Sequence, residues 1–518
     1  MVDRKCTAAD RDCPGYHLVP TSGWMGDPNG IIFHDGRYHV FYQHNPNDMW
    51  LGNPAWDRMD NVPWGPAANP NVPKGLWGLH CGDVCWGHAV SEDLVNWQHW
   101  PIAISATPGG YDAGGCFSGC TVINDGVPTI VYTSTTRTPA AGIRTLRAQS
   151  IATSDDGMVT WQKHPSNPVL ADVPDLSGAI HAWHDPHVWQ EEDGWYMALG
   201  CGCPNVAGVI LLYHSADLLN WQYMHPLYVS GAIEKSGDRW LVPDFFKLGD
   251  KHVLLFCTGT PDAACFTGYA VGDYVDHCFI PEVEGVLGPG SAPSAMAART
   301  LLDDQGRRIV FCQLGDERGD VNQRQAPRTG VLSLPWELSL LDDLTLGVQP
   351  VDEVCSKHQP DWQFENVTLA PGKTWRADSV AGDMLELVAE INVGQADEVA
   401  LGVRCSNDGR EQTLIVYNRL EQKLSVDPSH SSTDEGSCEE SCGSVLKLAG
   451  NEPLRLHVFV DRSTVEGFAN GRACVFHRIR PLLEDSVNVE LVARGGEAEV
   501  TTLNAWRKEA VKITGLDN

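Results

Sequence analysis

Short runs of alternating or continuous apolar residues, each closed by a Gly or Asp turn, recur along most of the chain, and helix-period segments are hard to find. Alternation of apolar and polar positions over about four to eight residues is typical of β-strands, whereas apolar positions three and four residues apart indicate helices. The pattern therefore predicts an all-β protein.

One hairpin-like unit is repeated five times in the first two thirds of the chain. Each unit holds two apolar runs joined at a turn glycine, and these glycines are Gly36, Gly126, Gly194, Gly249 and Gly306. A second element, read as SEDLVNW, SDDGMVTW and SADLLNW, lies between the hairpins at 91–97, 154–161 and 215–221. Units that recur at this spacing, each with room for about four strands, are typical of propeller blades. The sequence thus predicts a five-bladed β-propeller.

The repeats stop near residue 346, and the pattern beyond is different. Runs such as DMLELVAEIN and LRLHVFVDRSTVEGF are short strands at the spacing of a β-sandwich. We therefore predict a propeller at 1–345, a linker at 346–361, a C-terminal β-sandwich at 362–510 and a tail at 511–518.

Charge narrows the classes of partner. The chain carries 37 Lys and Arg against 67 Asp and Glu, a formal net charge of −30. It has no basic run that would attract phosphate backbones or anionic lipids, and no apolar stretch of about 20 residues that would span a bilayer. We expect no nucleic-acid partner and no membrane, and a small-molecule or oligosaccharide substrate instead.

Cysteine and histidine spacing gives no metal pattern. The 17 cysteines are an odd number, and pairs such as Cys201 and Cys203 do not reproduce the CxxC pairs of structural zinc sites. His184 and His187 would point to opposite faces of a strand. We expect no metal and no cofactor. Many unpaired cysteines, and an opening segment without the apolar core of a signal peptide, favour a cytoplasmic location over a secreted mature form.

Two carboxylates are expected to meet at the centre of the propeller. The first strand of each blade lines the central funnel, so residues at a fixed distance before the turn glycines should face one cavity. Eight or nine residues before these glycines stand Asp27, Ser118, Asp185, Leu241 and, in the fifth unit, Ala297 or Ala298. Trp24 and Trp183 flank the two aspartates, and aromatic faces beside carboxylates are typical of carbohydrate sites. The alternative is that an Asp before Pro only ends a strand.

Ordered motifs over nearly the whole chain resemble glycoside hydrolase family 32, the group of invertases, inulinases and levanases. GWMGDPNG resembles the family's WMNDPNG, FYQHNP its FYQYNP, and WGHAVSEDLVNW is almost unaltered. FSG matches, HDP stands where the family has RDP, and WLVPDFF where it has WECPDFF. GVLSLPWELSL and VDRSTVEGFANG resemble the family's GVLSLPRELSL and DRSSVEVFVN. The resemblance implies a five-bladed propeller, a β-sandwich and a fructosyl-binding funnel.

The resemblance also implies roles for individual residues. Asp27 would be the nucleophile of a retaining β-fructofuranosidase acting on sucrose or fructans, and Asp185 would hold fructose hydroxyls in the transition state. Asn29 would in addition orient Asp27 through the turn. The residues expected to shape the fructose subsite are Trp24, Met25, Gly26, Asn29, Gln43, Trp50, Trp86, Phe117, Ser118 and His184.

The general acid/base of the family is missing. Its Glu in the WEC motif is replaced by Leu241, which cannot donate a proton, and general acid–base assistance is typically worth about 10² to 10⁴ in rate. Glu234 and Asp244 stand at odd offsets from Leu241, on the opposite face of a continuous strand. His184 replaces the Arg of RDP, and Gly26 replaces the Asn before the nucleophile.

Two hypotheses follow from these departures. The first is an enzyme of β-fructofuranosidase type, a hydrolase or a fructosyltransferase, with impaired turnover or altered specificity. The second is a non-catalytic protein that kept the fructose- or fructan-binding propeller. A related five-bladed glycosidase acting on arabinose polymers would leave the sandwich motif unexplained.

Overall fold

The computed structural model describes residues 12–46, 84–138, 144–174, 181–203, 207–229, 239–259, 266–289, 295–314, 328–434 and 441–515. Within these ranges the regular structure is β-strand apart from one turn of 3₁₀ helix, η3 (Asp352–Val354). None of the helices in the described part of the chain is long and apolar enough to cross a membrane.

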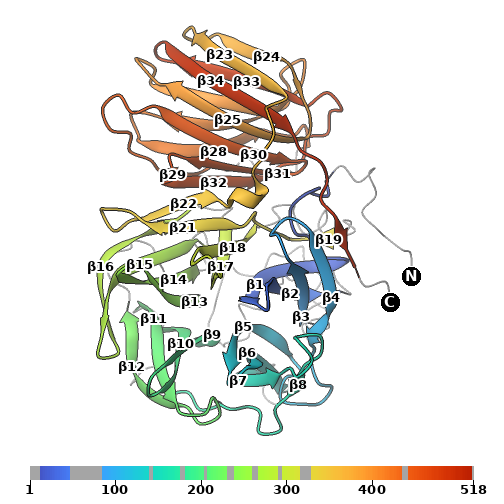
Figure 1. Cartoon of the computed structure of the whole chain (residues 1–518), viewed down its shortest axis with the longest axis vertical. Helices are drawn as coiled ribbons and strands as arrows, with labels where there is room; N and C mark the ends of the chain where they lie inside the picture. Colours follow the sequence, from blue (N-terminus) through green and yellow to red (C-terminus); the bar gives the residue numbers. More distant parts are fainter. Residues whose placement is uncertain are drawn as a thin grey trace.

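Five sheets form the propeller (Figure 1). The first consists of β1 (Gly23–His34), β2 (Arg37–Asn45), β3 (Cys85–Ser91) and β4 (Trp97–Ile104), flanked by β19 (Arg328–Thr329) and β35 (Ile513–Thr514). The second consists of β5 (Gly115–Asn124), β6 (Val127–Thr138), β7 (Arg144–Thr153) and β8 (Gln162–Lys163). The third consists of β9 (His181–Glu191), β10 (Gly194–Cys203), β11 (Ala207–Ser215) and β12 (Gln222–Val229).

The fourth sheet consists of β13 (Arg239–Leu248), β14 (Lys251–Gly259), β15 (Thr267–Val275) and β16 (Cys278–Leu287). The fifth consists of β17 (Ala295–Leu302), β18 (Arg308–Leu314), β21 (Trp336–Leu340) and β22 (Leu346–Pro350), with β20 (Val331–Leu332) beside β18. The first strands of the blades contact one another in a ring, β1 with β5, then β9, β13 and β17, and β17 with β1 again. The predicted five-bladed propeller is confirmed.

The two sequence repeats correspond to two turns of the blade. The glycines at 36, 126, 249 and 306 have φ between 61° and 82°, a conformation that L side chains rarely adopt, and they close the first hairpins. In the second repeat an Asp closes the turn before the fourth strand. The Oδ1 atom of Asp93 accepts from the amides of Val95 and Asn96 at 2.9 and 2.7 Å, and Asp217 repeats this arrangement in the third blade.

Every first strand carries a bulge at the same place. Two residues of the first strand lie opposite one residue of the second, between Met25 and Pro28, Cys116 and Gly119, His184 and His187, Leu241 and Asp244, and Met296 and Arg299. A bulge of this kind bends the strand and changes the direction of its side chains. The bulged pairs therefore fix the orientation of the side chains where the five first strands meet.

The C-terminal domain is a sandwich of two six-stranded sheets, drawn above the fifth blade in Figure 1. One sheet contains β23 (Trp362–Leu369), β34 (Ala498–Arg507), β25 (Met384–Asn392), β30 (Leu454–Asp461), β31 (Thr464–Ala469) and β32 (Ala473–Arg478). The other contains β24 (Thr374–Ala381), β33 (Asn488–Arg494), β26 (Glu398–Cys405), β27 (Gln412–Asn418), β28 (Lys423–His430) and β29 (Cys442–Val445). Their inward aliphatic side chains form one buried core.

Two segments between and after the domains belong to the propeller. Leu346–Pro350, at the start of the predicted linker, is β22, which pairs with β21 along its whole length and buries Leu346 and Val348 in the core. In the predicted tail, β35 pairs in parallel with β4 of the first blade. The chain thus crosses twice between propeller and sandwich.

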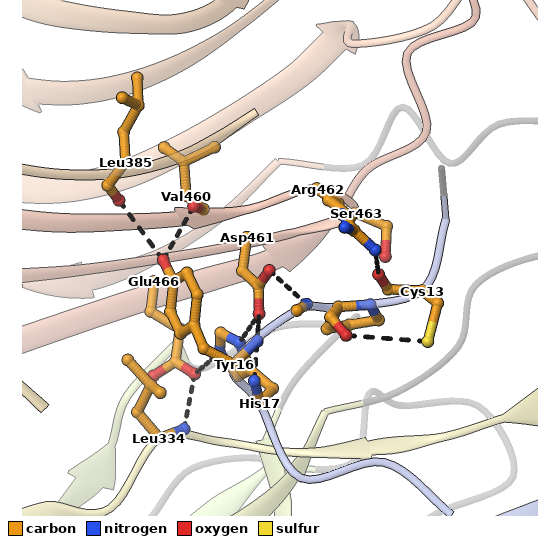
Figure 2. Close-up of polar contacts among 12 residues, drawn as sticks. Cys13, Tyr16, His17, Leu334, Leu385, Val460, Asp461, Arg462, Ser463 and Glu466 are labelled. Atoms are coloured by element: carbon orange, nitrogen blue, oxygen red, sulfur yellow. Dashed lines mark hydrogen bonds and ion pairs between the residues drawn. The ribbon is translucent and has the colours of Figure 1, made fainter. Parts of the chain in front are cut away.

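A buried polar cluster joins the N-terminal segment, the fifth blade and the sandwich (Figure 2). The Asp461 carboxylate accepts from the amides of Gly15, Tyr16 and His17 at 2.6, 2.8 and 3.1 Å, and lies 2.7 Å from His17 Nδ1. Glu466 lies 2.8 Å from His17 Nε2. Both carboxylates come from the VDRSTVEGF motif, so this motif builds a domain junction.

Glu466 also reaches the fifth blade. Its Oε1 accepts from the Leu334 amide at 2.9 Å, and its Oε2 accepts from Trp336 Nε1 at 2.7 Å. Burial lowers the pKa of His17, but the hydrogen bonds to Asp461 and Glu466 outweigh it and raise the pKa to about 9. His17 is therefore a buried cation held between two acids at neutral pH.

We expect the His17 contribution to stability to disappear at alkaline pH. The folded-state pKa of about 9 lies above the unfolded value near 6.5, so the contribution is complete below pH 6.5, declines as pH rises, and is lost above about 9. It amounts to roughly 3 kcal/mol. In urea unfolding, the wild type should exceed His17→Gln by this amount at pH 6 and by little at pH 10. An equal difference at both pH values would contradict the assignment.

Candidate active site

Asp27 is held by a short chain of hydrogen bonds from neighbouring strands. Ser118 Oγ of β5 donates to Asp27 Oδ2 at 2.6 Å, and Gln43 Nε2 of β2 donates to Ser118 Oγ at 2.5 Å. Asp27 is half-buried, whereas Ser118 is fully buried. Burial and the charge of Asp185 raise the pKa of Asp27 to about 6, against the opposing effects of Ser118 and Arg299. Asp27 is thus mostly ionised at neutral pH but titrates close to it.

Asp185 occupies the first bulge position of β9, with φ of 62°. Its backbone N–H donates to Thr133 Oγ1 at 2.8 Å, which anchors this uncommon conformation. Its Oδ2 lies 2.6 Å from His184 Nδ1 and accepts from the Val242 amide at 3.3 Å. Burial raises the pKa of Asp185, but His184 and Arg299 outweigh it and hold the pKa below its ordinary value.

The structure couples the two predicted carboxylates. The charge of Asp185 acts on Asp27, and the guanidinium of Arg299 acts on both. Asp27 therefore has the raised pKa of the pair and Asp185 the lowered one. Two carboxylates with different pKa values are the usual basis for different roles in one site.

Several of the predicted site residues lie beside Asp27 on β1. The Trp24 indole lies so close to Gly26 that a Cβ there would meet it at 2.1 Å, which accounts for glycine at this position. Asn29 is buried; in the orientation that satisfies its partners, its amide donates to Ser118 Oγ at 3.3 Å and its oxygen accepts from the Gln43 amide at 3.2 Å. Asn29 therefore acts on Asp27 through Ser118.

Other predicted residues belong to the core. Met25 and Trp86 have no exposed surface, and Trp86 Nε1 donates to the carbonyl of Phe117, itself buried, at 2.9 Å. Trp183, interpreted from the sequence as an aromatic beside the sugar, is buried in the third blade and donates to Tyr213 Oη at 3.1 Å. That interpretation was wrong, because Trp183 faces the blade core. Trp50 and Glu234 lie outside the described residues.

The pairing register corrects the count from the turn glycines. Leu241 precedes the bulge of β13 as His184 precedes the bulge of β9, so Leu241 corresponds to His184, and Val242 corresponds to Asp185. The count treated Asp185 and Leu241 as equivalent because Gly194 opens β10, whereas Gly249 lies within its turn. Equal distances from these two glycines therefore do not mark equal places in the blades.

Asp244 has structural partners. It is buried, its Oδ2 accepts from the Thr300 amide at 2.5 Å, and its Oδ1 lies 3.1 Å from His187 Nδ1. The carboxylate thus ties β13 to β9 and β17.

Arg299 was missed by the sequence analysis. It is 2% exposed, and its guanidinium donates to the Pro243 carbonyl and, at 3.5 Å, to the Asp185 carbonyl. It follows the bulge of β17, at the place that Asp244 has in β13. The repeat count stopped at Ala297 and Ala298, so only the bulge register could have identified this cation.

Two groups of residues in the described ranges have donor sets that a metal ion could use. Cys355, which follows η3, lies with Glu386 of β25 and His457 of β30. Glu191 and Asp193 at the end of β9 lie with His277 of the turn between β15 and β16. Glu386 is already hydrogen-bonded to the Ser356 amide, Lys508 and His457. Neither group includes Asp27 or Asp185.

Both domains match models of one known protein family. The sequence model described as "Glycosyl hydrolases family 32 N-terminal domain" matches residues 17–63 and 75–350, and that for the family's C-terminal domain matches 354–507. A sucrose-6-phosphate hydrolase of Zymomonas mobilis is 30% identical over 98% of this chain and 94% of its own length. A levanase of Bacillus subtilis is 29% identical over 95% of this chain and 69% of its own.

Solved structures share the fold. Fructan 1-exohydrolase IIa from Cichorium intybus has a TM-score of 0.81 at 23% identity, covering 98% of this chain and 99% of that one. Exo-inulinase from Aspergillus awamori has a TM-score of 0.76 at 23% identity, covering 96% and 99%.

Ser118→Ala should raise the pKa of Asp27 above its value of about 6, because the substitution removes a hydrogen bond to the charged form. A bond of this kind is worth about one pH unit or somewhat more. Carbon-13 NMR of labelled aspartate, with Asp27→Asn to assign the signal, would measure the shift. Ser134→Ala is the matched control, since Ser134 bonds to Ser150 and the Ala148 carbonyl. An unchanged Asp27 pKa would contradict the predicted effect of the Ser118 hydrogen bond.

Proposed function

The chain belongs to glycosyl hydrolase family 32, and from this premise we propose that it is a β-fructofuranosidase-type hydrolase that cleaves sucrose or fructans with retention of configuration. The observation that carries the proposal is the coupled pair of Asp27 and Asp185, whose pKa values the surrounding residues move in opposite directions. One carboxylate with a raised pKa and one with a lowered pKa in the same site fit the two roles that retaining fructosyl transfer requires.

Asp27 would attack the anomeric carbon of the fructosyl unit. Ser118 occupies Oδ2, so Oδ1 is the oxygen available to form the ester intermediate, which water later opens. Asp185 is held through Oδ2 by His184 and Val242, which leaves its Oδ1 to accept from fructose hydroxyls. Because its pKa is low, Asp185 stays ionised and stabilises the positive charge of the transition state.

The substrate class follows from the relatives and the charge. Relatives of similar length are named sucrose-6-phosphate hydrolase and raffinose invertase, and one fructan exohydrolase structure contains 1-kestose. A net charge of −30 supports a neutral sugar, with no nucleic acid or membrane as partner.

Two features of the cysteines bear on the cellular location of the protein. Buried thiols such as Cys120 and Cys312 support the cytoplasm, whereas the disulfide bond at Cys13 supports an oxidising compartment. Fractionation of cells of the source organism, with detection of this chain, would decide between the two.

Leu241 favours one other candidate function, a fructose- or fructan-binding protein without turnover. Cleavage of sucrose releases a sugar oxygen that needs a proton, and a leucine supplies none. Substrates with different leaving groups separate the two candidates, because a phenolate leaves without protonation.

We expect the wild type to consume p-nitrophenyl β-fructofuranoside faster than sucrose, and Asp27→Asn to lose at least about 10³-fold of kcat/KM on both. The acid limb of the wild-type profile should lie near pH 6, since protonation of Asp27 removes the nucleophile. Progress curves at several pH values would measure this. Fructose binding by calorimetry without turnover of either donor would instead identify the binding protein.

A further inference from the structure

His184 has one ring nitrogen engaged and one unengaged. Its Nδ1 lies 2.6 Å from Asp185 Oδ2, and only 9% of the side chain is exposed. Its Nε2 is buried and has no hydrogen-bond partner among the described residues. A carboxylate that holds Nδ1–H fixes the tautomer, so Nε2 is the atom at which this imidazole gains and loses a proton.

The position of His184 beside residue 241 is also established by packing. His184 pairs with Gly200 of β10, and a Cβ on Gly200 would meet the Leu241 Cα at 3.2 Å. The Val242 amide in turn donates to the Asp185 carboxylate that holds His184. The imidazole therefore lies on the part of the third blade that adjoins Leu241 of the fourth blade.

We propose that His184 is the general acid and base of this chain and performs the role that Leu241 cannot. The inference rests on the proposed function, since it assigns a step of the same reaction. His184 replaces the arginine expected from the family motif, and an arginine keeps its protons at any working pH, whereas an imidazole exchanges one near neutrality.

The step balances with His184 and water alone. An Asp27 oxygen forms a bond to the anomeric carbon while the bond from that carbon to the leaving oxygen breaks, and the proton on Nε2 passes to this oxygen. Nε2 then takes a proton from water, whose oxygen attacks the anomeric carbon and releases Asp27. The imidazole is protonated again at the end of the cycle, and Asp185 remains ionised throughout.

Charged groups from several blades face the imidazole. Burial lowers the pKa of His184, the neighbouring Asp185 raises it, and Arg147 of β7 and Arg239 of β13 lower it, with a net lowering. Arg299 of β17 lowers the pKa of Asp185, the partner of His184, and the charge of Asp185 acts on Asp27 of β1. The working form needs His184 protonated and Asp27 ionised, so activity on sucrose should be confined to a narrow range of acidic pH.

Leaving-group dependence tests the proposal on the unmodified protein. Sucrose turnover should fall on the basic side as His184 loses its proton, whereas p-nitrophenyl β-fructofuranoside turnover should keep its acid limb and lack that basic limb. The same basic limb for both donors would overturn the inference. Absence of turnover with both donors would instead overturn the proposed function, so the two failures are distinguishable.

A substitution provides the second test. His184→Gln should lower kcat/KM on sucrose by about 10² to 10⁴ and on the activated donor by less than about tenfold, because only sucrose needs the proton. Leu241→Glu added to His184→Gln should restore sucrose turnover. The matched control is His187→Gln on the same strand, which should affect both donors equally. Equal losses on both donors in His184→Gln, with fructose binding retained, would show a structural role and overturn the proposal.

Discussion

The two-for-one bulge in the first strand of every blade is the constraint on which the site depends. A continuous strand would send successive side chains to opposite faces of each blade, into the contacts between blades. The bulge interrupts this alternation where the five first strands meet. Three of the bulges begin with a non-glycine residue at positive φ, namely Asp185, Val242 and Ala297, so the backbone bears a conformational cost at this place.

Hydrogen bonds between blades hold that conformation. The Asp185 amide reaches Thr133 of the second blade, the Val242 amide reaches Asp185, and Arg299 of the fifth blade reaches the Asp185 carbonyl. Each contact joins one first strand to another blade. The hydrogen bonds that close the ring of blades therefore also set the geometry of the site. The sandwich is held separately, by the cluster of His17, Asp461 and Glu466 at the domain junction.

The sequence predicts what local turns and repeats encode. The turn glycines and the Asp-closed turns located the blades, because φ > 0 and Asx turns need particular residues. The contacts that position the site could not be derived in this way. His17 meets Asp461 across 444 residues, and Arg299 meets Asp185 across 114, and no local pattern marks such pairs. Trp183 was misassigned because a strand read without its bulge does not reveal which face a side chain takes.

Asp27 and Asp185 are chemically identical groups that the fold makes different. Asp27 has a neutral hydroxyl as its close partner, whereas Asp185 has an imidazole and a backbone amide, and the charge of Arg299 acts on both carboxylates. Asp185 therefore ionises first, and its charge is one cause of the raised pKa of Asp27. A proton on His184 offsets part of that charge and so lowers the pKa of Asp27 in turn. Protonation of the imidazole and ionisation of the nucleophile thus favour each other, and the working state is more populated than two independent titrations would allow.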